Sequence, residues 1–318
     1  MKFLEKIKSI FFKNRIKTIS TGFDSRKIIL IIKKEKNADV ALNILKNYCS
    51  MMSSSDISEV IVNLAISKRI EAIEIAQNYI TPYDLYDIAL KNLDYKGKLE
   101  VLEKFQYKLD LEDIFGLFDN LPPDQRSVAL SKSIDRFDSF SLSEIIRNYI
   151  PLYERLDCLN LYHDKLDSSS KARIIEKLDS DRKIEALKQY GNEINKTDLN
   201  SIICHTETSK ISSVLDVAYH NLTSQQIADI IQYYIPENEK LTTLYKCCNN
   251  LDSSNIADLI KFAIPESEKE EALVTLQNRI KSNNIGEIIQ FCIKNVHVLE
   301  KVKNNLDMED IEYFKNNF

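Results

Sequence analysis

Apolar residues recur along the chain with a period of 28–29 residues. The segment TSQQIADIIQYYIPENEK begins at Thr223 and aligns without a gap with DSSNIADLIKFAIPESEK, which begins 29 residues later at Asp252. The spacing extends through one apolar column that marks the end of each repeat: Phe23, Met52, Ile80, Leu109, Phe137, Leu166, Ile194, Leu222, Leu251, Ile280 and Met308. Repetition at a fixed period over residues 24–308 predicts an array of about ten structural units.

The first half of each repeat has the apolar spacing of an amphipathic helix. Apolar residues follow the repeat end at the fifth, eighth and ninth positions, as Ile256, Leu259 and Ile260 follow Leu251. This spacing places them on one helix face, whereas a strand would alternate every second residue. Lys171 is the one polar residue in the fifth-position column. A further apolar column, 21 or 22 positions after each repeat end, predicts a second helix.

Small polar residues predict where the first helices begin. Six of them are candidate N-caps, because their side-chain oxygens can accept the unpaired N–H groups of a first turn: Ser53, Thr81, Ser141, Thr197, Thr223 and Asp252. Two have the capping-box partner three residues later: Ser141 with Glu144, and Thr223 with Gln226. Proline recurs at one later position, followed by acidic residues, which marks the start of the second helix: Pro122, Pro151, Pro236 and Pro265.

Each repeat is therefore expected to be two helices of about 10–12 residues joined by a short turn. One such hairpin cannot bury its apolar face alone, so it must stack on its neighbours. The predicted fold is all-α: an α-solenoid of about ten tandem helix-turn-helix repeats. Repeat length and helix-pair form resemble the short HEAT-like repeats over residues 24–308, although Gly, Arg and Ala are scarcer here. The resemblance implies a superhelical architecture and carries over no functional residue.

The two ends of the chain are predicted to be caps. Residues 1–23 contain MKFLEKIKSIFFKNRIK, which has the pattern of a basic amphipathic helix. We expect this helix to cover the open end of the first repeat; contact with an anionic membrane and a targeting role are the alternatives. Membrane contact would use its apolar face: Phe3, Ile7, Ile10 and Phe11. At the other end, residues 309–318 are expected to form a C-terminal cap.

The charge balance disfavours nucleic acid as the main partner. The net charge is −5, whereas nucleic-acid binders usually carry a basic excess. A loose column of basic residues near the second-helix starts, interspersed with acidic ones, is the candidate partner-binding set: Lys68, Arg69, Lys98, Arg126, Arg155, Arg182, Lys183, Lys210 and Lys240. This column keeps a nucleic-acid-binding helical-repeat protein, either DNA-glycosylase-like or RNA-reading, as the alternative function.

The sequence contains no motif that predicts catalysis, a metal site or a cofactor. The four His and six Cys residues lack the CxxC and HExxH spacings of zinc sites. Glycine-rich phosphate loops and the GxSxG nucleophile motif are also missing. A cysteine nucleophile completed by His and Asp from other repeats stays open as an alternative. We expect a protein that is not an enzyme and that has no catalytic residue, metal or cofactor.

These patterns favour a binding scaffold that holds another protein or peptide in the groove of its repeats. We expect exposed second-helix positions to line the groove, where acidic residues would complement a basic partner segment. Four aromatic residues three positions after the second-helix column are interpreted as core: Tyr48, Phe105, Tyr162 and Tyr190. The chain lacks an apolar run of membrane-spanning length, so a cytoplasmic protein is expected, with peripheral membrane contact through residues 1–23 as an option. The abundance of Ile, Lys and Asn adds the hypothesis of a host-directed role.

Overall fold

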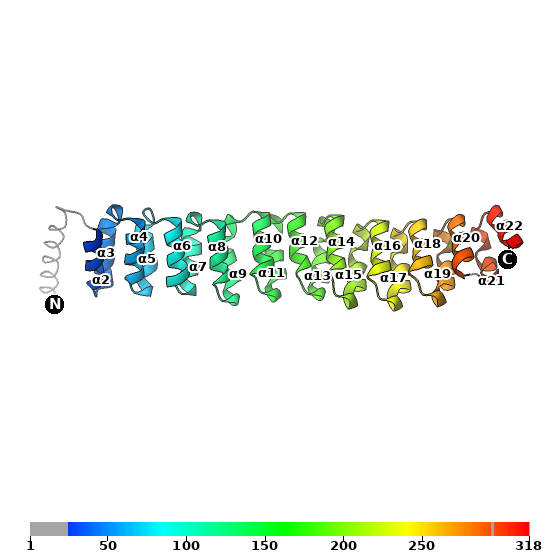
Figure 1. Cartoon of the computed structure of the whole chain (residues 1–318), viewed down its shortest axis with the longest axis horizontal. Helices are drawn as coiled ribbons and strands as arrows, with labels where there is room; N and C mark the ends of the chain where they lie inside the picture. Colours follow the sequence, from blue (N-terminus) through cyan, green and yellow to red (C-terminus); the bar gives the residue numbers. More distant parts are fainter. Residues whose placement is uncertain (1–24, 294–295, 318) are drawn as a thin grey trace. The chain divides into compact units, whose positions relative to one another are not determined.

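The computed structural model describes residues 25–293 and 296–317, and these form 21 α-helices and no strand. The predicted all-α fold is confirmed. The chain divides between Phe137 and Asp138 into two compact units. In each unit, helix hairpins stack in series as in an α-solenoid (Figure 1).

Unit 1 contains four hairpins, each made of a first and a second helix. They are α2 (Ser25–Lys34) with α3 (Ala38–Tyr48), α4 (Ser54–Asn63) with α5 (Ile66–Ala76), α6 (Pro82–Asn92) with α7 (Tyr95–Phe105), and α8 (Leu111–Asp119) with α9 (Arg126–Ser133). The first helices contact one another in the order α2, α4, α6, α8, and the second helices in the order α3, α5, α7, α9. The unit therefore has two helical layers.

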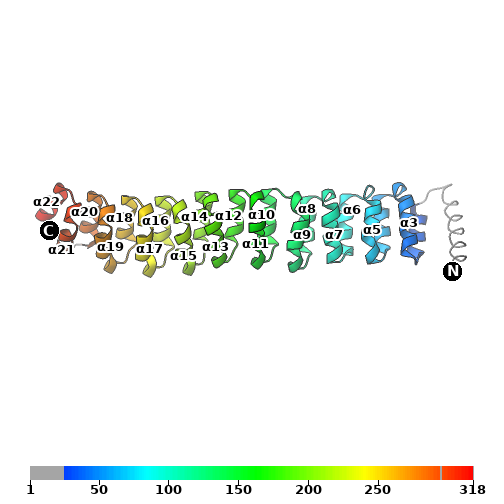
Figure 2. The ribbon, with the colours of Figure 1, turned by 180° about the vertical axis from the view of Figure 1, so that it is seen from behind.

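Unit 2 contains six hairpins and a final helix (Figure 2). They are α10 (Ser139–Asn148) with α11 (Arg155–Tyr162), α12 (Ser168–Glu176) with α13 (Ser180–Tyr190), α14 (Lys196–Cys204) with α15 (Ile211–Ala218), α16 (Ser224–Tyr233) with α17 (Lys240–Cys247), α18 (Ser253–Phe262) with α19 (Lys269–Leu276), α20 (Ser282–Ile288) with α21 (Val296–Val302), and α22 (Met308–Asn317). The two units thus hold the ten predicted hairpins. Helix α22 covers the segment expected to be the C-terminal cap, and it contacts α20.

The predicted apolar columns form the core. The fifth-position residues Ile57, Leu142 and Ile256 are all 0% exposed. Burying one such side chain stabilises the fold by about 1.5–3 kcal/mol. Lys171 is also buried, at 6% exposed, and its ammonium group forms an ion pair with Glu193. The lysine is thus accommodated in an apolar column because its charged end reaches a carboxylate.

Four of the six predicted N-caps are confirmed, and two are wrong. Ser53, Thr81, Thr223 and Asp252 cap their helices, and the capping box between Thr223 and Gln226 is present. Helices α10 and α14 begin earlier than predicted, at the caps Asp138 and Asn195. In both helices an Asx side chain lies upstream of the predicted residue and accepts the N–H that the helix start leaves unpaired.

The predicted capping box at Ser141 is therefore also wrong. Ser141 lies inside α10, and its N–H donates to the carboxylate of Asp138 (2.7 Å). Glu144, its proposed partner, instead forms an ion pair with Arg147 (2.9 Å).

The recurring prolines lie where the first helix gives way to the second. Pro236, for example, precedes a 3₁₀ turn over Glu237–Glu239, and α17 begins only at Lys240. The α-helical part of the second helix therefore starts four residues after the proline, because one 3₁₀ turn intervenes.

Serine side chains connect successive repeats. A serine at the first position of a first helix accepts a hydrogen bond from the backbone N–H that precedes the next first helix. Six serines do so: Ser54 from Thr81 (2.7 Å), Ser139 from Asp167 (2.8 Å), Ser168 from Asn195 (3.0 Å), Ser224 from Asp252 (2.9 Å), Ser253 from Lys281 (2.7 Å) and Ser282 from Asp307 (2.7 Å). These serine rungs satisfy N–H groups that a helix start would otherwise leave without a partner.

Candidate functional site

The basic residues predicted to bind a partner lie at the ends of helices. Arg69, in α5, donates to the carbonyl oxygens of Leu64 (3.1 Å) and Val62 (2.8 Å) at the end of α4. Its guanidinium also donates to the carbonyl of Asn92, at the end of the next first helix, α6. The C-terminal end of a helix carries partial negative charge, so a cation there stabilises both helices.

Five more members of the set make the same kind of contact. They donate to carbonyl oxygens at or near first-helix ends: Lys98 to Asn120 (3.4 Å), Arg126 to Leu121 (3.2 Å) and Asp119 (3.1 Å), Arg155 to Ile150 (3.0 Å) and Lys177 (3.2 Å), Lys183 to His205 (3.3 Å), and Lys240 to Gln232 (2.8 Å). Burial lowers the pKa of Arg155 and Lys183. We call these five residues and Arg69 the cation column.

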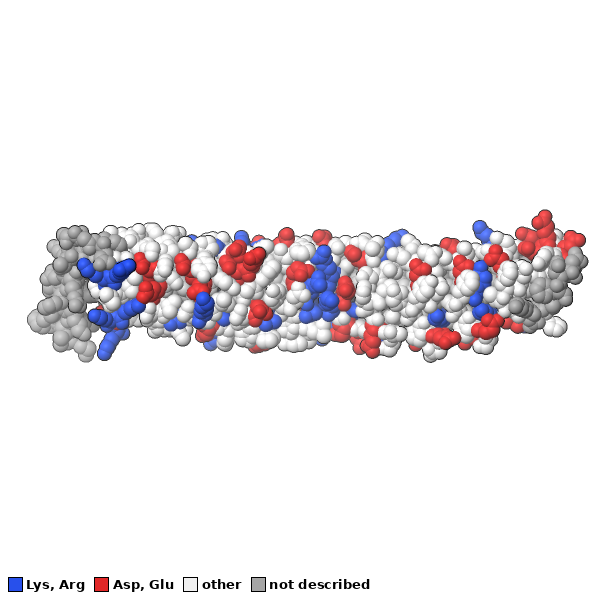
Figure 3. Space-filling view, viewed as in Figure 1, with Lys and Arg blue, Asp and Glu red and all other residues white. Residues whose placement is uncertain are grey.

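The remaining three predicted cations bind carboxylates. Lys68 pairs with Asp39 (2.9 Å) and Glu71 (3.0 Å), Arg182 with Asp179 (3.1 Å), and Lys210 with Asp181 (3.1 Å). On the face shown in Figure 3, Lys and Arg form separate clusters in each unit, divided by acidic and uncharged surface. Binding of a partner by these nine residues stays a prediction, and their contacts give each of them a structural role.

The residues predicted to contact a membrane belong to the N-terminal segment. Phe3, Ile7, Ile10 and Phe11, proposed for membrane contact, lie outside the described residues. Among the described residues, no helix combines the length and apolar character that crossing a membrane requires.

The described residues hold no cluster of three His, Cys, Asp or Glu side chains arranged to bind a metal ion. None of the six cysteines, all of which are among the described residues, forms a disulfide, and Cys49, Cys158 and Cys247 are buried. Burial raises the pKa of Cys247 to about 12, and it also raises the pKa of Cys49 and Cys204. A raised pKa keeps a thiol protonated and weakens it as a nucleophile.

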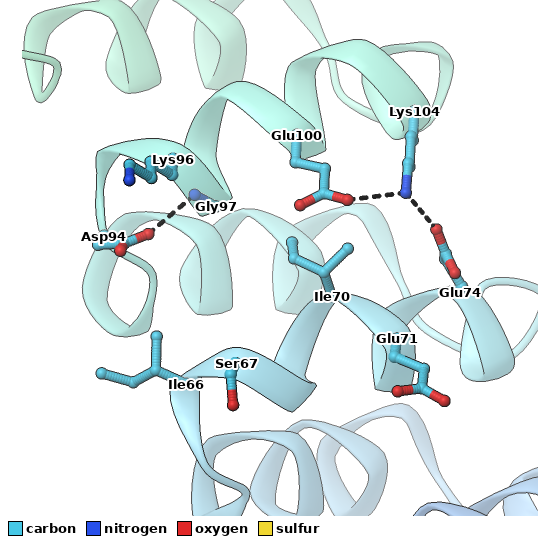
Figure 4. A pocket seen from close by; sticks show the side chains of 10 residues that line it. All are labelled: Ile66, Ser67, Ile70, Glu71, Glu74, Asp94, Lys96, Gly97, Glu100 and Lys104. Atoms are coloured by element: carbon cyan, nitrogen blue, oxygen red, sulfur yellow. Dashed lines mark hydrogen bonds and ion pairs between the residues drawn. The ribbon is translucent and has the colours of Figure 1, made fainter.

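A shallow groove of about 340 Å³ lies between α5 and α7 in unit 1 (Figure 4). Both are second helices, the layer where the sequence predicts a groove. Its walls combine the apolar Ile66 and Ile70 with several carboxylates. Lys104 bridges two of these, Glu74 (2.6 Å) and Glu100 (2.7 Å), and these contacts raise its pKa. Two carboxylates of the groove are therefore already neutralised by a lysine of the same groove.

A row of exposed aromatic side chains lies on the surface of unit 2. Tyr233, Phe262 and Phe291 are 70%, 71% and 65% exposed. Tyr233 and Phe262 end α16 and α18, and Phe291 lies in the π-helical turn Ile289–Ile293 that continues α20. Helix α16 contacts α18, and α18 contacts α20. The three side chains, here called the aromatic row, therefore recur once per repeat on neighbouring helices.

Carboxylates accompany the aromatic row. Asp229, Asp258 and Glu287 each lie four residues before an aromatic residue, which places them on the same helix face. Further acidic residues follow in the turns after Pro236 and Pro265. The segments 229–240, 258–269 and 287–291 together contain seven carboxylates and three lysines. The row is thus apolar along its length and acidic on both flanks.

One lysine links the carboxylates within the row. Lys261 forms ion pairs with Asp258 (3.0 Å) and with Glu287 (2.9 Å) of the next repeat. Its ammonium nitrogen also lies 5.4 Å from the ring centroid of Phe262, within the range of a cation–π contact. At this position a lysine is thus held by an aromatic ring and by flanking carboxylates.

The sequence interpretation missed the aromatic row. Of the aromatic residues interpreted as core, Phe105 and Tyr190 are buried, while Tyr48 and Tyr162 are half-buried. The signal for the row was an aromatic residue three positions before the recurring proline, as Phe262 precedes Pro265. No family model and no curated protein matches this chain.

Proposed function

We propose that this protein is a non-enzymatic scaffold that binds a segment of another protein, and that the aromatic row in unit 2 is its principal binding surface. The single observation that supports this is the exposure of three large aromatic side chains at one repeat position. We further propose that the repeats are HEAT-like in kind and that the protein works in the cytoplasm.

Exposed aromatic residues in a row favour protein binding on energetic grounds. Aromatic side chains are enriched among the residues that dominate interface energies, where truncation of one costs about 2 kcal/mol or more. Each bound aromatic residue removes a large apolar area from water. Because the row recurs on consecutive first helices, one partner segment lying across them would contact all three residues.

The flanking carboxylates favour a basic partner. A positively charged segment would be attracted to the acidic flanks, and the interaction would weaken as salt screens it. The same carboxylates would repel nucleic-acid phosphates, and the cation column donates to backbone carbonyls. The observations therefore support a protein partner more strongly than the nucleic-acid alternative.

The test compares capture by the tagged chain with capture by the triple variant Tyr233→Ser, Phe262→Ser, Phe291→Ser. Lysate of cells that express the protein is treated with nuclease before capture and mass spectrometry. We expect specific proteins whose recovery falls about tenfold or more with the variant, as loss of about 1.4 kcal/mol or more of binding energy implies.

The matched control is Phe140→Ser. Phe140 is also an exposed phenylalanine on a first helix of unit 2, but the guanidinium of Arg173 lies 4.6 Å from its ring centroid. This variant is expected to recover the same partners as the unmodified chain. Recovery that the triple variant leaves unchanged would refute the row as the binding surface, and nucleic acid in place of protein would support the alternative function.

A further inference from the structure

Lys261 in unit 2 shows how the aromatic row binds an ammonium group. The ammonium nitrogen lies 5.4 Å from the ring centroid of Phe262 and forms ion pairs with Asp258 and with Glu287 of the next repeat. The side chain of this lysine is 14% exposed, so its surroundings remove most of it from water. We call this arrangement an ammonium site: an aromatic residue of the row, the carboxylate four residues before it, and a carboxylate of the next first helix.

The same groups recur one repeat earlier, around Tyr233. Asp229 lies four residues before Tyr233, and Asp258 of α18 is the carboxylate of the next first helix. The residue directly before the ring is here Gln232 instead of a lysine. Lys240 also reaches the end of α16, but its ammonium group donates to the backbone carbonyl of Gln232 (2.8 Å). The ring and both carboxylates of an ammonium site are therefore present, with a neutral side chain in place of the lysine.

The carboxylates around Tyr233 leave this site negatively charged. Asp229 accepts a hydrogen bond from the side-chain amide of Gln225 (2.8 Å), and this neutral donor does not cancel its charge. Asp258 is shared with the next site, where it pairs with Lys261 (3.0 Å). Asp229, Asp258 and Glu287 outnumber the one lysine between them. A second ammonium group beside the ring would therefore still leave a net negative charge.

The third member of the row, Phe291, has a different environment. The side-chain amide of Gln290 donates to the hydroxyl group of Tyr313 in α22 (3.2 Å), so its partner on the next first helix is a phenol and not a carboxylate. Of the three sites, the one around Tyr233 is thus the one that combines two carboxylates with an uncharged residue at the position of Lys261.

We propose that the site around Tyr233 receives a lysine side chain of the partner segment, held as Lys261 is held beside Phe262. This inference rests on the proposed function, because it gives the chemistry of the partner at the same surface. The negative face of an aromatic ring attracts a cation, and the carboxylates form charged hydrogen bonds with it. At the other end of the row, an apolar residue of the partner would lie against Phe291.

The row also sets the separation of these two partner residues. Packed helices have axes about 8–10 Å apart, so Tyr233 and Phe291, which lie two first helices apart, are separated by about 16–20 Å. A polyproline II segment has three residues per turn and rises about 3.1 Å per residue, so side chains six residues apart lie on one side at about 19 Å. A lysine and an apolar residue at this spacing can therefore contact both ends of the row.

The probe is a fluorescein-labelled peptide of one lysine, five prolines and one leucine, in that order. Its control has glutamine in place of the lysine. Binding to the full chain is measured by fluorescence anisotropy, with the protein titrated to about 1 mM. We expect the lysine peptide to bind about tenfold more tightly than the glutamine peptide, a ratio that corresponds to about 1.4 kcal/mol. Its binding should weaken as the salt concentration rises.

The variant Gln232→Lys gives the site a lysine of the chain itself. This lysine should occupy the site, because Lys33, at the same repeat position in unit 1, also pairs with a carboxylate of the next first helix, Glu59. We expect the variant to bind the lysine peptide about tenfold more weakly than the unmodified chain. The matched control is Thr242→Lys, which adds the same charge at an exposed position of the second helix α17 and should leave binding unchanged.

A second variant, Asp229→Asn, removes one carboxylate and keeps the size of the side chain. It should weaken binding of the lysine peptide and leave binding of the glutamine peptide unchanged. Equal binding of the two peptides, or no binding of the lysine peptide, would overturn the proposal. So would binding that Gln232→Lys leaves unchanged, or an equal loss in Thr242→Lys, since the peptide would then respond only to the overall charge.

The outcome is separable from that of the proposed function. Partner capture is repeated with Gln232→Lys and Thr242→Lys, and recovery should fall in the first variant alone. If the peptide results fail but capture still depends on the aromatic row, only the recognition of a lysine is wrong. If capture is also independent of the row, the row is not a binding surface.

Discussion

The cation column and the aromatic row both recur at fixed repeat positions, yet their side chains have opposite environments. In the cation column, Arg69 and Lys183 point their charges at the carbonyl ends of helices. In the aromatic row, Phe262 leaves 71% of its surface exposed. The first set binds helix ends, and four of its members also reach the next repeat: Arg69, Lys98, Arg155 and Lys183. The second set is available to another molecule.

The difference shows that periodicity alone does not separate structural from functional residues. A recurring cation is a reasonable candidate for a binding strip, but any helix end supplies carbonyl oxygens that can take its charge. A recurring aromatic residue is a reasonable candidate for core, but the row lies on the face that also carries Asp229 and Asp258. The exposed fraction of a side chain and its contacts distinguish a structural residue from a candidate binding residue. Substitution of inward-facing residues should therefore lower stability, whereas substitution of exposed ones such as Phe262 should not.

The largest effect is expected from a lysine placed in the core without a carboxylate. Ile256 occupies in its repeat the position that Lys171 occupies in another, and Arg279 stands where Glu193 does, directly before the apolar residue that ends the repeat. We expect Ile256→Lys to lower the free energy of unfolding by about 4 kcal/mol, because it buries an unpaired charge. Urea denaturation followed by circular dichroism measures the loss, and hydrogen exchange in α18 locates it.

The double variant Ile256→Lys, Arg279→Glu supplies the missing partner. It should recover part of the lost stability, since Glu193 has that role for Lys171. If the single variant were as stable as the unmodified chain, the ion pair of Lys171 would not explain how the column tolerates a lysine.

Removal of Arg69 tests the cation column directly. We expect Arg69→Met to cost about 3 kcal/mol, because three carbonyl groups at the ends of α4 and α6 lose a charged hydrogen-bond donor. Hydrogen exchange should accelerate in both helices. Phe262→Ser should change stability by no more than about 0.5 kcal/mol, as is usual for exposed positions. Similar losses in the two variants would remove the distinction between the column and the row.

A smaller effect is expected at the serine rungs. Ser224 accepts hydrogen bonds from the N–H of Asp252 (2.9 Å) and the side-chain amide of Asn255 (2.7 Å). We expect Ser224→Ala to cost about 1–2 kcal/mol, because both donors lose an acceptor. The readout is faster amide exchange at the start of α18. Ser254→Ala, at an exposed position of the same helix, is the control and should leave that exchange unchanged.

The fold followed from the sequence because the repeat forces apolar residues such as Ile256 and Leu259 onto one helix face ten times over. The first residue of each helix was harder to predict. Asp138 and Ser141 can both act as N-caps, and the local spacing does not show which of them begins the helix. The serine rungs depend on partners about one repeat away, and the cation column depends on partners within its own hairpin as well as in the next; all of these partners are backbone groups that every residue has. To predict the aromatic row, one must know which side of α18 faces outward. Asp258, one turn before Phe262, already indicated that side.

The smallest expected effect is on the stability of the protein at low pH. The backbone N–H groups of Ser141 and Ser170 donate to the carboxylates of Asp138 and Asp167 and lower the pKa of both. A carboxylate whose pKa is depressed by folding stabilises the protein above its unfolded pKa, and that stability is lost as the pH falls through the folded value. The urea midpoint of unit 2 should therefore decrease below about pH 4. Asp167→Asn keeps a capping side chain that cannot titrate, so it should reduce this acid sensitivity, whereas Phe262→Ser should not. An unchanged pH profile in Asp167→Asn would mean that the cap contributes no charge-dependent stability, and that the acid response arises elsewhere in the repeats.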